Sequence, residues 1–220
     1  MAPTVLSPAS PAELLHYIVT FQAYPTTLLI CCSREEFVLS LISNIQRQAP
    51  GGHPQAPEEL RSPPLLSASL YQIAVARHIR ILFIPTVTHL RAYLSAFTPS
   101  DSLTPPPPNL PSPSAKRKPP LLLVFGFLGL HRDSSEWSAQ GISSSAAVLV
   151  EAGRRTEFKP VIVEPKGASG HEDFRAVLQD DAPVLSGSSR RDEGVWMGRT
   201  VEVRRVLGRW FRFQTGQWDV

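Results

Sequence analysis

The stretch 119-PPLLLVFGFLGLHRD-133 decides the fold class. Between Pro120 and His131 it contains no charged and no polar side chain. A short apolar run of this kind, bounded by turn residues, is typical of a strand that is buried on both faces of a sheet. The sequence therefore predicts a central strand over 121–128, and the run is only about half as long as a bilayer-spanning helix.

Three further apolar runs predict strands of the same kind, namely 26-TTLLICCS-33, 79-IRILFIP-85 and 159-KPVIVE-164. Helical periodicity predicts a helix that begins at Pro11 and helices over 33–48, 65–77, 88–97, 135–155 and 173–178. Ser10 can cap the first helix, and Ser33 with Glu36 fits a capping box on the second. Apolar strands that alternate with helices predict an α/β fold, a three-layer sandwich with a mainly parallel central sheet.

The chain has 220 residues, which is enough for one domain with its own core. Residues 1–10 are expected to form a flexible leader. The segment 98–120 is expected to be a disordered insert because it is rich in proline and low in complexity. Residues 11–97 and 121–220 would then form a single domain.

The last part of the chain, 199-RTVEVRRVLGRWFRFQ-214, is expected to form a C-terminal antiparallel hairpin. A three-residue loop at 206–208 would pair Val203 with Phe211 on the apolar face. In this register Gly208 would adopt the left-handed conformation.

Composition argues against several classes of protein. The net charge of +3 is mildly basic and permits contact with nucleic acid. The two cysteines, Cys31 and Cys32, are adjacent and point to opposite faces of a strand, so we expect neither a structural disulfide nor a cysteine-rich zinc site. The six histidines show no paired spacing. We expect no metal, no cofactor, no secretory signal and no membrane contact, and a nuclear location with the cytoplasm as the alternative.

Nucleotide hydrolysis needs motifs that the sequence does not contain. A phosphate-binding loop has the form G-x-x-x-x-G-K-[ST], whereas the chain has 51-GGHP-54. The strand that holds the metal in such ATPases ends in an acid, but Gly126 and Gly129 follow here, and the first carboxylate is Asp133. We therefore expect no ATP hydrolysis and assign no catalytic residue.

Two short motifs invite a catalytic interpretation that they do not support. The triplet 131-HRD-133 resembles a kinase catalytic loop, but Ser138 stands where that loop needs an asparagine. The serines of 141-GISSS-145 fall inside a predicted helix and not at a strand-to-helix elbow. Their small side chains are expected to allow the helix to pack closely on the sheet.

An arginine-rich segment is the candidate contact surface. Within 190–212 there are seven arginines, three acidic residues and no lysine, and two tryptophans are interleaved. Arginine beside aromatic rings suits single-stranded nucleic acid and protein interfaces alike. A solvated edge with ordinary ion pairs is the third interpretation. The candidate residues are Arg190, Arg191, Arg199, Arg204, Arg205, Arg209, Trp210 and Arg212.

The order of these segments resembles the RecA-type ATPase core of small recombinase paralogues. It is most similar to the short, divergent paralogues that pair with a SWIM-domain partner in Shu-type complexes. In this resemblance 121-LLLVFGFLGLH-131 takes the place of the Walker B strand, and 79-IRILFIPTVTHLRAYLSAF-97 matches the preceding strand and helix. The resemblance covers most of the chain outside 98–120, but the Walker A loop is absent and the Walker B acid is replaced near Gly126.

The resemblance implies a RecA-like, non-catalytic subunit of a mediator complex in DNA repair by homologous recombination. The implied partners are another RecA-like or SWIM-domain protein in a hetero-oligomer, and single-stranded DNA. One alternative is a RecA-like accessory subunit of Elongator, which binds transfer RNA. Another is a small-molecule enzyme with an unrecognised site, for which a ligand in a pocket at the carboxyl ends of the strands would speak.

Overall fold

The computed structural model describes residues 2–21, 25–48, 69–102, 119–132, 134–167, 171–185, 199–216 and 218. Six strands form the central sheet: β1 (Thr4–Leu6), β2 (Thr26–Ile30), β3 (Ile79–Phe83), β4 (Leu121–Phe125), β5 (Lys159–Val163) and β8 (Arg212–Gln214). Their order is β3-β2-β4-β5-β1-β8, and every neighbouring pair is parallel. The predicted α/β class with a mainly parallel central sheet is confirmed.

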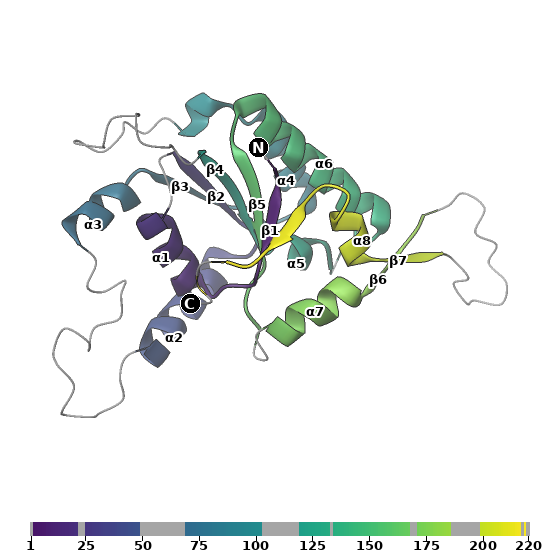
Figure 1. Cartoon of the computed structure of the whole chain (residues 1–220), viewed down its shortest axis with the longest axis horizontal. Helices are drawn as coiled ribbons and strands as arrows, with labels where there is room; N and C mark the ends of the chain where they lie inside the picture. The colour runs from purple at the N-terminus through teal and green to yellow at the C-terminus, as the bar shows by residue number, and fades with distance from the viewer. Residues whose placement is uncertain are drawn as a thin grey trace.

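Helices cover both faces of this sheet (Figure 1). On one face lie α1 (Pro11–Phe21) and α2 (Arg34–Gln48), and α3 (Leu70–Ala76) packs beside α1. The other face carries α4 (Val87–Ala96), α5 (Phe127–Arg132), α6 (Ala139–Thr156), α7 (His171–Gln179) and α8 (Val203–Leu207). Each face therefore buries its own apolar cluster, and the resulting three-layer sandwich is consistent with a RecA-like arrangement.

Two helix starts follow from the local sequence as expected. At α1, the Ser10 N–H donates to Glu13 Oε2 at 2.7 Å, and the Glu13 N–H donates to Ser10 Oγ at 3.3 Å. At α2, Ser33 and Glu36 form the same reciprocal pair, with distances of 3.0 and 3.1 Å. Each pair satisfies two backbone donors that the first helical turn leaves free.

The prediction that the opening strand continues to residue 128 was wrong. β4 ends at Phe125, and α5 begins at Phe127. Gly126 makes the turn with φ of 82°, a left-handed conformation that glycine adopts without strain. The apolar run continues past the strand because Phe127 and Leu128, the first two residues of α5, are buried at 0% and 2% exposure.

The predicted flexible leader was also wrong for residues 4–6. Thr4–Leu6 form β1, which pairs with β5 on one side and with β8 on the other, so that purple and yellow segments lie side by side in Figure 1. Val5 is 1% exposed, so this three-residue strand is part of the core. In the segment expected to be a disordered insert, Pro99–Ser102 form a 3₁₀ helix, and 103–118 lie outside the described residues.

The C-terminal hairpin exists in a different form from the one predicted. The antiparallel pair is made by β6 (Asp181–Pro183) and β7 (Thr200–Glu202), whereas β8 joins the central sheet in parallel. Residues 203–207 are helical because Val203, Val206 and Leu207 recur at helical spacing and are all buried. Gly208 has φ of −62°, so the predicted left-handed turn at this glycine is wrong as well.

Candidate functional site

The carboxyl ends of β2 and β4 form the place where a sheet of this order usually binds a ligand. The two strands are neighbours, but the chain leaves β2 toward β3 and leaves β4 toward β5. Ligands of open parallel sheets bind in the crevice where the connections diverge in this way. The chain enters α2 after β2 and α5 after β4, and a helix N-terminus attracts negative charge.

A carboxylate of the chain itself occupies the start of α5. Glu164 follows β5 directly, and its Oε1 accepts the Leu128 N–H at 2.8 Å. The backbone N–H groups of Phe127 and Gly129 also donate to this carboxylate. Glu164 is 6% exposed, so the contact is closed to solvent. β4 does not end in an acid, but its neighbour β5 is followed by Glu164. The Glu164 carboxylate binds backbone amides of α5.

At the start of α2 a carboxylate is also present, but it is the exposed side chain of Glu36 from the first turn of the helix itself. This side chain accepts the Ser33 N–H within the capping box described above. Both helix starts at the divergence point, where the chain leaves β2 and β4 in opposite directions, therefore already hold a carboxyl group of the chain. An anionic ligand at either place would have to displace a carboxylate that the fold supplies.

Burial raises the pKa of Glu164 to about 7, although the three backbone N–H groups act in the opposite direction. Protonated and ionised forms therefore coexist at neutral pH. Burial also raises the pKa of the Cys31 thiol, and the charge of Glu164 adds to the effect. A buried thiol of this kind is chemically inert.

The two cysteines are free thiols on opposite sides of the sheet. Cys31 belongs to the apolar cluster beneath α4 and α6, whereas Cys32 packs against the cluster beneath α1 and α2. The prediction that they point to opposite faces and do not pair is confirmed.

A buried polar network holds the other end of α5. His131 Nδ1 lies 2.8 Å from the carbonyl oxygen of Phe127, which can only accept, so Nδ1 carries the proton. His131 Nε2 therefore accepts from the Ser145 hydroxyl at 2.8 Å, and Arg91 Nε donates to the same Ser145 oxygen at 2.9 Å. Burial lowers the pKa of His131, which keeps the ring neutral.

This serine–histidine contact is structural. Ser145 and His131 are both 0% exposed, so no substrate carbonyl can reach the hydroxyl oxygen. That oxygen also accepts from Arg91, which lowers its nucleophilicity. The contact joins α4, α5 and α6, and it gives Ser145 a defined role beyond the close packing that its small size predicts.

The arginine-rich segment lies mainly along one edge of the molecule, which we call the α8–β8 edge (residues 203–214). Arg204 and Arg205 belong to α8, Arg209 lies in the turn after it, and Arg212 begins β8. All four are exposed.

The remaining predicted contact residues lie elsewhere. Arg199 precedes β7, and Arg190 and Arg191 lie outside the described residues. Trp210 is half-buried, and its Nε1 donates to Ser143 Oγ on α6 at 3.1 Å, so it anchors the turn.

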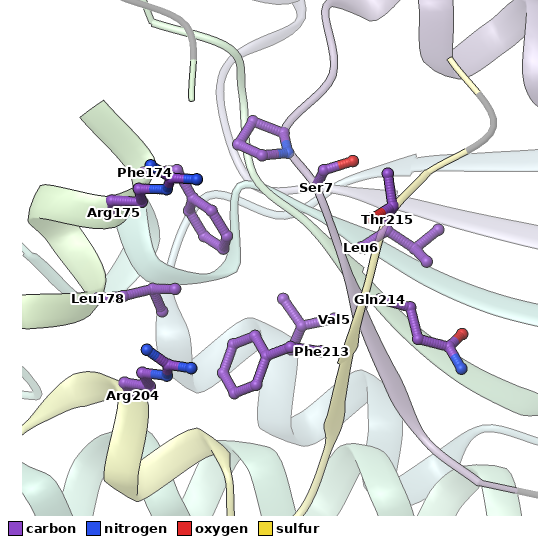
Figure 2. A pocket seen from close by; sticks show the side chains of 11 residues that line it. Val5, Leu6, Ser7, Phe174, Arg175, Leu178, Arg204, Phe213, Gln214 and Thr215 are labelled. Atoms are coloured by element: carbon purple, nitrogen blue, oxygen red, sulfur yellow. The ribbon is translucent and has the colours of Figure 1, made fainter. Parts of the chain in front are cut away.

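A cleft of about 530 Å³ opens at the carboxyl ends of β1 and β8 (Figure 2). Val5 and Leu6 of β1 and Leu178 of α7 provide apolar lining. Phe213 of β8 and Phe174 of α7 present their rings to the cleft from opposite sides. The cleft thus lies on the same edge of the sheet as the divergence point, but at its far end.

Two guanidinium groups line this cleft, Arg175 from α7 and Arg204 from α8. The Arg204 guanidinium lies over the Phe213 ring, with its carbon 5.9 Å from the ring centroid. Neither arginine forms an ion pair with a residue in the described part of the chain. The cleft therefore combines apolar walls with two positive charges that no ion pair of the described residues compensates.

Sequence reasoning identified Arg204 but missed its neighbours in the cleft. Phe174 and Arg175 come from α7, whereas Arg204 and Phe213 come from α8 and β8, and no local pattern joins the two segments. It also missed Glu164, for which a signal was present, because 161-VIVE-164 is an apolar strand that ends in an acid.

Among the described residues, no group of three or more His, Cys, Asp or Glu side chains could hold a metal ion. In the same residues no helix is long and apolar enough to cross a membrane. No protein-family model matches the sequence, and no curated protein matches it in a sequence search.

Proposed function

We propose that this chain is a non-catalytic, RecA-like subunit of a DNA-repair complex that mediates homologous recombination. In this proposal it acts in the nucleus by binding a second RecA-like or SWIM-domain protein, with single-stranded DNA as a further partner. The link to recombination rests on the resemblance of the segment order, and of the stretches 79–97 and 121–131, to recombinase paralogues.

The observation that carries the non-catalytic role is the pair of carboxylates at the divergence point. In a nucleotide hydrolase, helix starts at this place receive phosphate groups. Here Glu36 and Glu164 occupy them, and Glu164 is bonded to three backbone N–H groups of α5. Bringing phosphate to the same amides would place like charges together and would break these bonds.

The α8–β8 edge supports a role in binding. β8 is the last strand of the sheet, all three of its residues are exposed, and its outer side pairs with no described strand. An exposed strand edge offers backbone donors and acceptors to a partner strand. The four exposed arginines on this edge add charge that favours an acidic protein surface or a phosphate backbone.

The partner can be identified by affinity purification of the full chain from its native cell, followed by identification of the co-purifying proteins. The proposal expects a RecA-like or SWIM-domain protein that joins the chain in a stable hetero-oligomer. A ring with two distinct RecA-like chains and bound transfer RNA would instead identify the Elongator alternative and overturn the recombination role.

Nucleotide hydrolysis and DNA binding can be measured on the same purified complex. We expect no ATP turnover above background, and turnover that Glu164→Gln abolishes would contradict the non-catalytic role. Binding to single-stranded DNA is expected to weaken as salt rises and to fall in the triple variant R204Q/R205Q/R209Q. Absence of binding at low salt would remove DNA from the proposal and leave the protein partner in place.

A further inference from the structure

We propose that the cleft between β1, β8, α7 and α8 binds a nucleoside phosphate, with the base against the phenyl rings and the phosphate on the two guanidinium groups. The ligand is either a free nucleotide or one unit of a single strand, which share this chemistry. The inference rests on the proposed binding role, which it deepens by naming a ligand class. It does not depend on which protein partner the chain has.

The walls of the cleft suit a flat aromatic group. Figure 2 shows the rings of Phe174 and Phe213 projecting into the cleft from α7 and β8. Phe213 is 36% exposed, so its ring is accessible to a ligand in the cleft. Nucleobases stack on aromatic side chains with little dependence on sequence, because every base has a flat face.

The charges of the cleft suit a phosphate. Arg175 and Arg204 bring two positive charges that no described acid compensates. A terminal phosphate carries close to two negative charges at neutral pH, so it matches this pair better than a single carboxylate does. The planar guanidinium also offers paired N–H donors that match phosphate oxygens.

The size of the cleft agrees with this ligand. The volume of about 530 Å³ falls within the usual range for small-molecule sites. Arg204 and Phe213 of the cleft belong to the α8–β8 edge, which also carries the exposed Arg205, Arg209 and Arg212.

The proposal is tested by titrating the full chain with dAMP, deoxyadenosine and inorganic phosphate in a calorimeter. We expect dAMP to bind at least about tenfold more tightly than either fragment, because each fragment keeps only one of the two interactions. A short oligonucleotide that binds more tightly than dAMP would identify a strand as the source, and one that binds less tightly would identify a free nucleotide.

Matched variants separate the cleft from general charge. Arg204→Gln and Arg175→Gln are each expected to weaken dAMP binding by about tenfold or more, since each loses a charge-assisted hydrogen bond. Arg205→Gln makes the same change one residue away from Arg204 and outside the cleft lining, so it should change dAMP binding less than about twofold. Phe213→Leu should weaken dAMP binding and leave phosphate binding as it was.

Three results would overturn the proposal. The first is equal binding of phosphate and dAMP, which would mean a simple anion site. The second is an equal loss of affinity in Arg205→Gln and Arg204→Gln, which would mean non-specific charge. The third is tighter binding of O-phosphotyrosine than of dAMP, which would identify a phosphopeptide. None of these outcomes depends on whether the chain co-purifies with a recombination partner, so they are distinct from failure of the proposed function.

Discussion

The carboxyl edge of the sheet is filled by side chains of the chain at its centre and forms a cleft at its end. At the centre, beyond β2 and β4, the helix starts are filled by Glu36 and Glu164. At the end, beyond β1 and β8, a cleft remains open and is lined by Arg175 and Arg204. The strands run in the same direction at both places, so strand direction does not determine which place is available to a ligand.

The difference lies in the polar groups that the chain provides at each place. Every parallel strand ends in backbone groups that need partners, and the fold can satisfy them with its own side chains or leave them to a ligand. At the centre a carboxyl group bonded to three amides fills the helix start, whereas at the end the described residues provide guanidinium groups and no acid paired with them. Under the two proposals above, a ligand would therefore bind at the end of the sheet and not at its centre.

The largest effect is expected in the pH dependence of stability, which tests whether Glu164 is buried at the start of α5. The pKa of Glu164 is about 7 in the folded protein and 4.5 for the free side chain, so the folded state favours the protonated form. The stability that the protonated Glu164 side chain contributes to the folded state is fully present below pH 4.5. This stability is lost as the pH rises through about 7. Glu164→Gln cannot ionise, so the free energy of unfolding of the native protein relative to this variant should fall by about 3 kcal/mol between about pH 4.5 and 8.

Urea unfolding of both proteins across this pH range measures the effect. The glutamine keeps an oxygen that can accept the Leu128 N–H, so the variant is expected to fold. A constant difference between the two proteins at all pH values would mean that Glu164 is not held in a closed environment.

The second test concerns the network at the other end of α5. Ser145→Ala removes the donor to His131 Nε2 and the acceptor for Arg91 Nε, so it should lower the free energy of unfolding by about 2 kcal/mol. Ser144→Ala on the exposed side of α6 is the matched control and should change stability by less than about 0.5 kcal/mol. Equal effects in thermal or urea unfolding would show that the buried contact contributes nothing.

The turn at Gly126, between β4 and α5, gives a third test with an intermediate effect on stability. Gly126→Ala should destabilise the protein by about 1 kcal/mol, because φ of 82° is costly for alanine although no atom lies within 3.7 Å of the added carbon. Gly129→Ala should have the opposite sign, since this glycine lies within α5 with no atom near the new carbon. A stabilising Gly126→Ala would mean that the turn is not left-handed.

The smallest effects on stability are expected in the cleft at the carboxyl ends of β1 and β8. Arg175→Gln and Arg204→Gln should each change the free energy of unfolding by about 0.5 kcal/mol or less, because both side chains are exposed and form no described ion pair. Urea unfolding of these variants checks this expectation. A large loss of stability would mean that the arginines support the fold, which would remove the contrast between the two ends of the sheet.

Much of the fold could be predicted because its signals are local. The apolar runs at 26–30, 79–83, 121–125 and 159–163 each specify a strand by themselves, and Ser33 with Glu36 specifies a helix start within four consecutive residues. Such patterns need no knowledge of what packs against them. The α/β class followed from their alternation along the chain.

The errors occurred where tertiary contacts decide the structure. Thr4–Leu6 are too few to give a periodic pattern, and only their place between β5 and β8 makes them a strand. Val203 and its neighbours fit both an alternating and a helical pattern over five residues. Packing of their apolar side against α6 and α7 selects the helix.

The candidate site was the least predictable part. The acid of Glu164 is visible in the sequence, but its partners are amides of a helix that begins 37 residues earlier, at Phe127. The cleft draws its lining from segments near residues 5, 174, 204 and 213. Sequence reasoning could mark Arg204 as a contact residue, but it could not find the rings and the second arginine that surround it.

The position of β1 also has a consequence for biosynthesis. Thr4 pairs with Arg212, so the two strands that form the cleft floor are separated by almost the whole chain. During translation β1 is made first, yet one of its edges has no partner until β8 has left the ribosome. Such non-local pairing slows folding and leaves a strand edge exposed to other chains in the meantime. The cleft is therefore among the last features to form, and its ligand would bind only chains whose synthesis has passed β8.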